Sequence, residues 1–131
     1  MKLDRTYVDE IIAHARADAP NECCGIIAGN DGHAEELYRA VNAEASPYRY
    51  NVDSKDLLRI YRDIDAYNWD LLAIYHSHTH TEAYPSPTDV SLAAWPEAHY
   101  LIVSLEDESN PVLRSFRIEE GQVTEETLEV G

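Results

Sequence analysis

The residues Leu71-Leu72-Ala73-Ile74-Tyr75-His76-Ser77-His78 form the stretch of this 131-residue sequence that decides its fold. The apolar run before the histidines is short and gives way to polar residues, which predicts a buried β-strand. Successive side chains of a strand point to opposite faces, so His76 and His78 are expected on one face of the sheet. A carboxylate, Asp89, follows eleven residues after His78.

Two imidazoles on one face of a rigid strand, with a carboxylate nearby, make a three-ligand set of the kind that holds zinc. Three protein ligands leave a fourth position for water, which is the arrangement of a catalytic rather than a structural zinc site. The pattern has an alternative interpretation, a solvated strand end at which His76 and His78 hydrogen-bond to neighbouring loops. The rest of the chain favours the metal site.

Length and composition predict a single globular domain that spans residues 1–131. The hydrophobic fraction is 44%, and no apolar run is long enough to predict a membrane-spanning helix. The N-terminal segment Met1–Arg5 lacks the apolar core of a signal peptide. The only cysteines, Cys23 and Cys24, are neighbours that cannot bridge without strain. These features predict a cytoplasmic protein in a reducing compartment.

The formal net charge is −15, with 25 acidic against 10 basic residues. Such a surface is expected to repel nucleic acid and anionic lipid, because neutralising phosphates requires clustered Lys and Arg. It favours partners that present a basic or neutral docking face. Adaptation to high salt is an alternative origin of the same composition. The sequence leaves open whether the chain forms a homodimer.

The spacing of apolar residues predicts helices and strands along the whole chain. Helices are expected at residues 4–18 and 53–67, with a shorter one from 88 or 89 to 94. Strands are expected at residues 24–28, 33–41, a short piece after the loop that begins at 45, 71–78, 99–104, 112–118 and 122–130. Asp31-Gly32 is typical of a hairpin turn. This order predicts an α/β fold in which helices pack on a curved, mixed β-sheet.

Several polar residues surround the histidine strand at characteristic spacing. The segment Glu22-Cys23-Cys24-Gly25 precedes a predicted strand, and Ser86 lies eight residues after His78 and three before Asp89. This combination with His76-Ser77-His78 resembles the JAMM (MPN-plus) metalloprotease family. The resemblance implies a hydrolase built as one curved mixed sheet flanked by helices, a layout related to that of cytidine deaminases.

The family resemblance also implies roles for five residues. His76, His78 and Asp89 are expected to bind one Zn²⁺ per chain, which lowers the pKa of its bound water to about 7. Glu22 is expected to take the proton from that water and deliver it to the leaving amine. Ser86 is expected to donate a hydrogen bond to the developing oxyanion or to hold the water.

Three further residues near the motif are given lesser roles. If the strand continued, His80 would lie on the same face as His76 and His78 and could be a third imidazole ligand. The family pattern does not require a histidine there, so His80 is expected to face solvent or to support a ligand. Cys23 and Cys24 are expected to be packing residues, because no basic partner lies near enough in the sequence to lower a thiol pKa.

Within the family, the closest resemblance is to the bacterial Mec-type sulfur-carrier-cysteine peptidases. Tyr75–Thr79, Thr81–Ser86 and Ala98–Tyr100 carry this likeness. It implies hydrolysis of the bond after the C-terminal Gly-Gly of a ubiquitin-like sulfur-carrier protein, with release of cysteine in cysteine biosynthesis. An extended glycine tail can pair with a strand edge and pass close to the metal.

Three alternatives compete with this function. A related JAMM isopeptidase or processing protease, acting on another ubiquitin-like modifier or sulfur carrier, would use the same catalytic residues. A non-enzymatic MPN scaffold would lack one or more of them, whereas all five are present. A zinc deaminase requires a Pro-Cys-x-x-Cys segment, which is absent from this sequence.

Overall fold

The computed structural model describes residues 1–131, which form eight strands and three helices. The helices are α1 (Arg5–Asp18), α2 (Ser54–Tyr67) and α3 (Pro87–Leu92). The strands are β1 (Lys2–Leu3), β2 (Cys24–Asn30), β3 (His33–Ala40), β4 (Asp70–His78), β5 (His99–Ser104), β6 (Val112–Glu119), β7 (Gln122–Glu126) and β8 (Glu129–Val130). No helix is long and apolar enough to cross a membrane.

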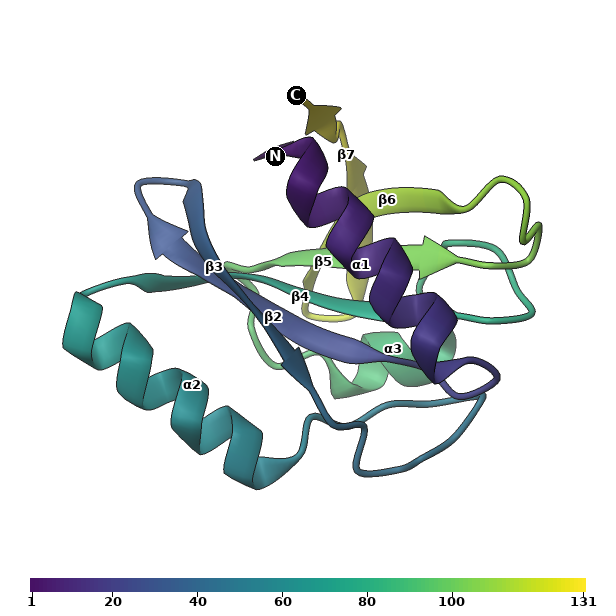
Figure 1. Cartoon of the computed structure of the whole chain (residues 1–131), viewed down its shortest axis with the longest axis horizontal. Helices are drawn as coiled ribbons and strands as arrows, with labels where there is room; N and C mark the ends of the chain where they lie inside the picture. The colour runs from purple at the N-terminus through teal and green to yellow at the C-terminus, as the bar shows by residue number, and fades with distance from the viewer.

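Six strands form one mixed sheet in the order β3-β2-β4-β5-β6-β7. Strands β4 and β5 run parallel, and every other neighbouring pair in this sheet is antiparallel. Helix α1 covers one face, and α2 and α3 pack on the other (Figure 1). The predicted α/β fold, a mixed sheet flanked by helices, is confirmed, and the structure shows that the helices lie on both faces.

Two apolar clusters, one on each face of the sheet, form the core. The cluster under α1 includes Val8, Ile11 and Tyr75. The opposite cluster includes Ile60 from α2 and Ile74 from β4. Alternation along β4 separates the two clusters, since Tyr75 and Ile74 point to opposite faces. His76 and His78 share the phase of Ile74 and therefore face the α2 and α3 side.

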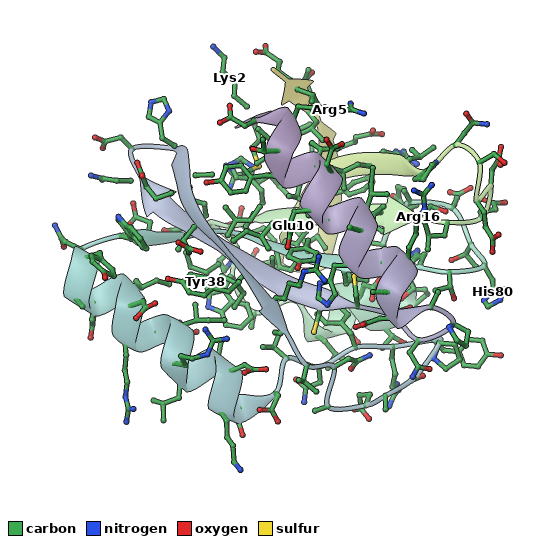
Figure 2. The ribbon with its side chains drawn as sticks, in the orientation of Figure 1. Lys2, Arg5, Glu10, Arg16, Tyr38 and His80 are labelled. Atoms are coloured by element: carbon green, nitrogen blue, oxygen red, sulfur yellow. The ribbon has the colours of Figure 1, made fainter.

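Local chemistry explains the clearest boundaries. The turn between β2 and β3 has positive φ at Asp31 (51°) and Gly32 (77°), as the predicted Asp-Gly hairpin requires. Asp53 caps α2 by accepting hydrogen bonds from the amides of Lys55 and Asp56. Tyr38 projects from β3 toward α2 (Figure 2), where its hydroxyl donates to Asp63 at 2.8 Å.

Three sequence-based predictions are wrong in detail. The segment before α2 contains no strand, only an isolated bridge between Asn42 and Val52, because the intervening residues form a loop. The predicted strand 122–130 is two strands, of which β8 pairs with β1 outside the main sheet. Helix α3 begins at Pro87 and ends at Leu92, since Ser86 takes the capping position.

Candidate metal centre

His76 and His78 lie side by side at the end of β4, and Asp89 reaches them from α3. The Nε2 atoms of the two histidines are 3.2 Å apart. Asp89 Oδ2 lies 3.1 Å from His76 Nε2 and 3.0 Å from His78 Nε2. All three residues are buried, and their ligand atoms lie within 4.8 Å of one another. The structure thus brings together the three ligands expected from the sequence.

The hydrogen bonds around these side chains prepare them as ligands. His78 Nδ1 donates to the carbonyl oxygen of Glu82 at 2.8 Å, which leaves Nε2 as the ring atom that faces the site. Asp89 Oδ2 also accepts a hydrogen bond of 2.9 Å from the Ser86 amide. His76 Nδ1 is buried and has no hydrogen-bond partner.

The protonation states of His76 and Asp89 suit a cation. Burial lowers the pKa of His76, which keeps this imidazole neutral. Burial opposes ionisation of Asp89, but the hydrogen bonds from His76 and His78 outweigh it and hold the pKa of this carboxyl well below its usual range. One neutral imidazole and one fixed carboxylate are the forms in which these side chains bind metals. For His78, burial lowers the pKa but the hydrogen bonds to Asp89 and Glu82 outweigh it and raise the pKa, so this imidazole releases a proton when it binds a metal.

Glu22 lies immediately before β2 and is only 3% exposed. Strand β2 pairs with β4 in a register that places Cys24 opposite His76, as the role expected of Glu22 requires. Burial raises the pKa of Glu22 to about 8; nearby His78 lowers it and Asp89 raises it. Its Oε1 atom is buried without a hydrogen-bond partner. A buried carboxyl with a raised pKa beside a ligand cluster has the properties of a general base.

Ser86 closes the other side of the cluster by capping α3. Its hydroxyl accepts a 3.0 Å hydrogen bond from the Asp89 amide, while Asp89 accepts from the Ser86 amide, which completes a capping box. The hydroxyl proton of Ser86 remains able to donate. The sequence placed Ser86 in the site without revealing this cap, which also fixes the Asp89 carboxylate.

His80 is not part of the ligand cluster. Its side chain is exposed at the outer edge of the molecule (Figure 2), with Nδ1 2.8 Å from the hydroxyl of Thr79. Cys23 and Cys24 are buried and unpaired, and burial raises the pKa of each thiol to about 12. Such thiols are poor nucleophiles near neutral pH.

The sequence did not reveal three residues that support the site. Ser77 accepts a 2.8 Å hydrogen bond from the Cys23 amide through its hydroxyl, and its own amide donates to the Cys23 carbonyl. The ring of Tyr50 stacks on His76 with 4.3 Å between centroids. Asn42, outside any strand, is buried. Of these three residues, only Ser77 has a signal in the local sequence, since it stands between the two histidines. The contacts of Tyr50 and Asn42 depend on the path of a loop.

The chain is similar to known proteins over most of its length. The profile of the family described as prokaryotic homologs of the JAB domain (Prok-JAB) matches residues 4–119. The chain is 47% identical over 125 residues to the CysO-cysteine peptidase of Mycobacterium tuberculosis, across 94% of this chain and 86% of that one. It is 36% identical over 104 residues to the desampylase of Haloferax volcanii, across 73% and 74% of the two chains.

A solved structure shows the same fold over nearly the full length. A protein of Desulfitobacterium hafniense superposes with a TM-score of 0.88 at 36% identity, covering 99% of this chain and 92% of that chain. The family match includes Glu22, which precedes β2, the histidines of β4 and Asp89 of α3. This chain therefore belongs to the family of prokaryotic JAB-domain homologs, as its JAMM-like motif predicted, and is a peptidase.

Proposed function

We propose that this protein is a zinc-dependent peptidase that hydrolyses the bond after the C-terminal Gly-Gly of a ubiquitin-like sulfur-carrier protein. The released residue is cysteine, for cysteine biosynthesis. The observation that carries the proposal is the convergence of three buried ligand atoms, from His76, His78 and Asp89, beside the buried carboxyl of Glu22. The 47% identity to a CysO-cysteine peptidase supports this substrate class.

The donor set fits zinc. Ligands at 2.0–2.1 Å from a tetrahedral zinc ion lie roughly 3.3 Å from one another. The three separations between His76, His78 and Asp89 are 3.0 to 3.2 Å, so a small adjustment accommodates one ion per chain. Two nitrogen ligands and one carboxylate oxygen are typical of catalytic zinc sites, which keep a fourth position for water. Zinc held by these three residues would lower the pKa of a bound water and polarise the scissile carbonyl.

Two side chains of this protein then handle the proton and the oxyanion. Glu22, with its unpartnered Oε1, accepts a proton from water and passes it to the leaving amine. Ser86 uses its free hydroxyl proton to stabilise the negative oxygen that develops on the carbonyl carbon. The capping box holds the Ser86 hydroxyl and the Asp89 carboxylate in one fixed relation.

The experiment is to incubate the protein with a ubiquitin-like carrier that ends in Gly-Gly-Cys and to measure the intact mass of the carrier. Loss of one cysteine residue, blocked by a chelator and restored by zinc, is expected. A carrier that keeps its full mass with the zinc-loaded protein contradicts the proposed substrate.

The buried, unbridged thiols Cys23 and Cys24 fit a reducing compartment, so we place this reaction in the cytoplasm.

The second candidate is cleavage of a ubiquitin-like modifier from a lysine side chain. The 36% identity to a desampylase favours it, and the same Glu22, Ser86 and ligand set would serve. The two candidates differ only in the leaving amine. A modifier joined through Gly-Gly to a lysine, offered beside the cysteine-terminated carrier, decides between them by the relative rates of cleavage.

A further inference from the structure

We propose that Asn42 is a positioning residue that holds the catalytic carboxyl and a metal ligand in a fixed relation through the loop of residues 43–51. The inference rests on the proposed function, which assigns Glu22 as the base and His76 as a ligand. In Figure 1 this loop connects β3 to α2 and runs beside the segment that joins α1 to β2.

The side chain of Asn42 is fully engaged with backbone groups. It is 8% exposed. Its Nδ2 donates to the carbonyl oxygens of Glu22 at 3.1 Å and Arg49 at 3.0 Å. Its Oδ1 accepts from the amides of Glu44 and Asn51, both at 3.0 Å. One amide thus ties both ends of the loop to the backbone of the catalytic residue.

The loop holds the Glu22 residue from both sides. The Glu22 amide donates to the carbonyl oxygen of Ser46, a loop residue, at 2.9 Å. The Glu22 carbonyl accepts from Asn42, as described above. Glu22 precedes β2 and lies outside its ladder, so these two contacts hold its own backbone amide and carbonyl, while Ser77 holds the neighbouring Cys23.

The same loop orients His76. The ring of His78 is fixed by the Glu82 carbonyl, but His76 Nδ1 has no partner, so no hydrogen bond at that atom sets the ring plane. Tyr50 stacks on His76 at 4.3 Å between centroids and 19° between planes. Tyr50 lies between Arg49 and Asn51, the two residues whose backbone groups bond to Asn42. Asn42 therefore sets the position of the ring that supports His76.

The loop stays closed at its base without this side chain. The Ala43 amide donates to Asn51, and the Asp53 amide donates to Val41, at 2.8 and 2.9 Å. Loss of the Asn42 side chain is expected to shift the loop rather than to unfold the protein. A positioning role can therefore be separated from a purely structural one.

The test compares Asn42→Ala and Asn42→Asp with Asp53→Ala. Asn42→Asp keeps the acceptor for the Glu44 and Asn51 amides but removes the donors to the Glu22 and Arg49 carbonyls. Asp53→Ala removes the cap of α2 and supplies a loss of stability without touching the site. The readouts are kcat and KM on the cysteine-terminated carrier, zinc affinity by chelator competition, and hydrogen exchange of the Glu22 amide in metal-free protein.

Both Asn42 variants are expected to lower kcat and to weaken zinc binding by roughly tenfold or more, as loss of a group that orients a ligand does. KM should change little, and the Glu22 amide should exchange faster. Asp53→Ala should match the wild-type protein in all readouts except stability. Adding Tyr50→Leu to Asn42→Ala should weaken zinc binding little further, because both act through one contact.

Zinc affinity and kcat within twofold of the wild-type values in the folded Asn42 variants would overturn the proposal, as would equal losses in Asp53→Ala. If Asn42→Ala does not fold, Asn42→Asp decides. A wild-type protein that fails to cleave the carrier refutes the proposed function instead. In that case the exchange rate of the Glu22 amide, which needs neither metal nor substrate, still decides the role of Asn42.

Discussion

Glu22 has the properties of a base because the fold removes it from water while leaving one of its oxygens without a partner. Burial raises its pKa to about 8, and Oε1 makes no hydrogen bond. A buried carboxyl of this kind is unfavourable for folding when ionised, unless a cation or a substrate proton compensates. The residue is therefore better explained by chemistry than by stability.

Glu22→Gln should retain metal and lose turnover. The amide has nearly the same shape but cannot accept a proton, so kcat should fall by roughly 10²–10⁴-fold, the usual contribution of general acid–base catalysis. The measurement is cysteine release from the carrier together with the metal content of the same sample. Activity near that of the wild-type protein would remove Glu22 from the mechanism.

The raised pKa of Glu22 also predicts how stability depends on pH in metal-free protein. Between pH 4.5 and about 8 the folded state holds a proton that the unfolded state releases. The favourable contribution of this group is complete below pH 4.5 and is lost as pH rises through about 8. Urea unfolding with a chelator present should show wild-type stability falling relative to Glu22→Gln over this range. A difference in stability between the two proteins that does not change with pH would contradict the raised pKa of Glu22.

At the scale of elements, the site depends on how two strands and one short helix meet. Strand β4 carries the histidines, β2 brings Glu22 beside them, and the first turn of α3 carries Asp89. Helix α3 is only six residues long, so much of its stability is expected to depend on its capping box. The cap residue, Ser86, is also the expected oxyanion donor, and these two roles can be separated.

Ser86→Ala and Ser86→Gly should separate capping from catalysis. Alanine at the cap costs about 1 kcal/mol of helix stability, whereas glycine costs only about a few tenths of a kcal/mol. Both variants remove the hydroxyl, so both should lose roughly 10²–10³-fold in kcat if the hydroxyl stabilises the oxyanion. Thermal unfolding and kcat are measured on both. Recovery of activity in the glycine variant would show that Ser86 acts only as a cap.

The sequence predicted the elements whose signal is local. The apolar run before His76, the Asp-Gly turn and the helical spacing around Ile60 each report their own neighbourhood, and the structure confirms them. The contact of β2 with β4 was required by the chemistry expected of Glu22 and is confirmed by the pairing register.

The features that the sequence missed depend on distant partners. The strands β1 and β8 are two residues each and exist only because the two ends of the chain meet (Figure 1). Asn42 looks like any polar residue after a strand until the loop folds back on it. The periodicity of apolar residues indicates which face of a helix or strand is buried. It gives no information about contacts between residues that are far apart in the sequence.

At the scale of the whole molecule, the net charge of −15 shapes how a partner approaches. Long-range attraction of a basic surface accelerates encounter and is screened by salt, with a Debye length of about 8 Å at physiological ionic strength. A carrier whose folded body presents basic residues would be captured this way. A short peptide with the same tail has no such body.

The intact carrier should therefore be cleaved faster than a short peptide that carries its last residues. The advantage should lie in kcat/KM, because docking improves capture rather than chemistry, and should shrink at high salt. Cysteine release from both substrates at low and high salt is the measurement. Equal efficiency without salt dependence would indicate a general carboxypeptidase.

The metal assignment can be tested most directly by counting zinc in intact protein with native mass spectrometry. We predict one zinc ion per chain in the wild-type protein and in His80→Ala, because His80 is exposed and outside the ligand cluster. His76→Ala should lose the ion, since one of three ligands is gone. A wild-type protein that binds no zinc, or a His76→Ala variant with undiminished zinc, would contradict the account of the site.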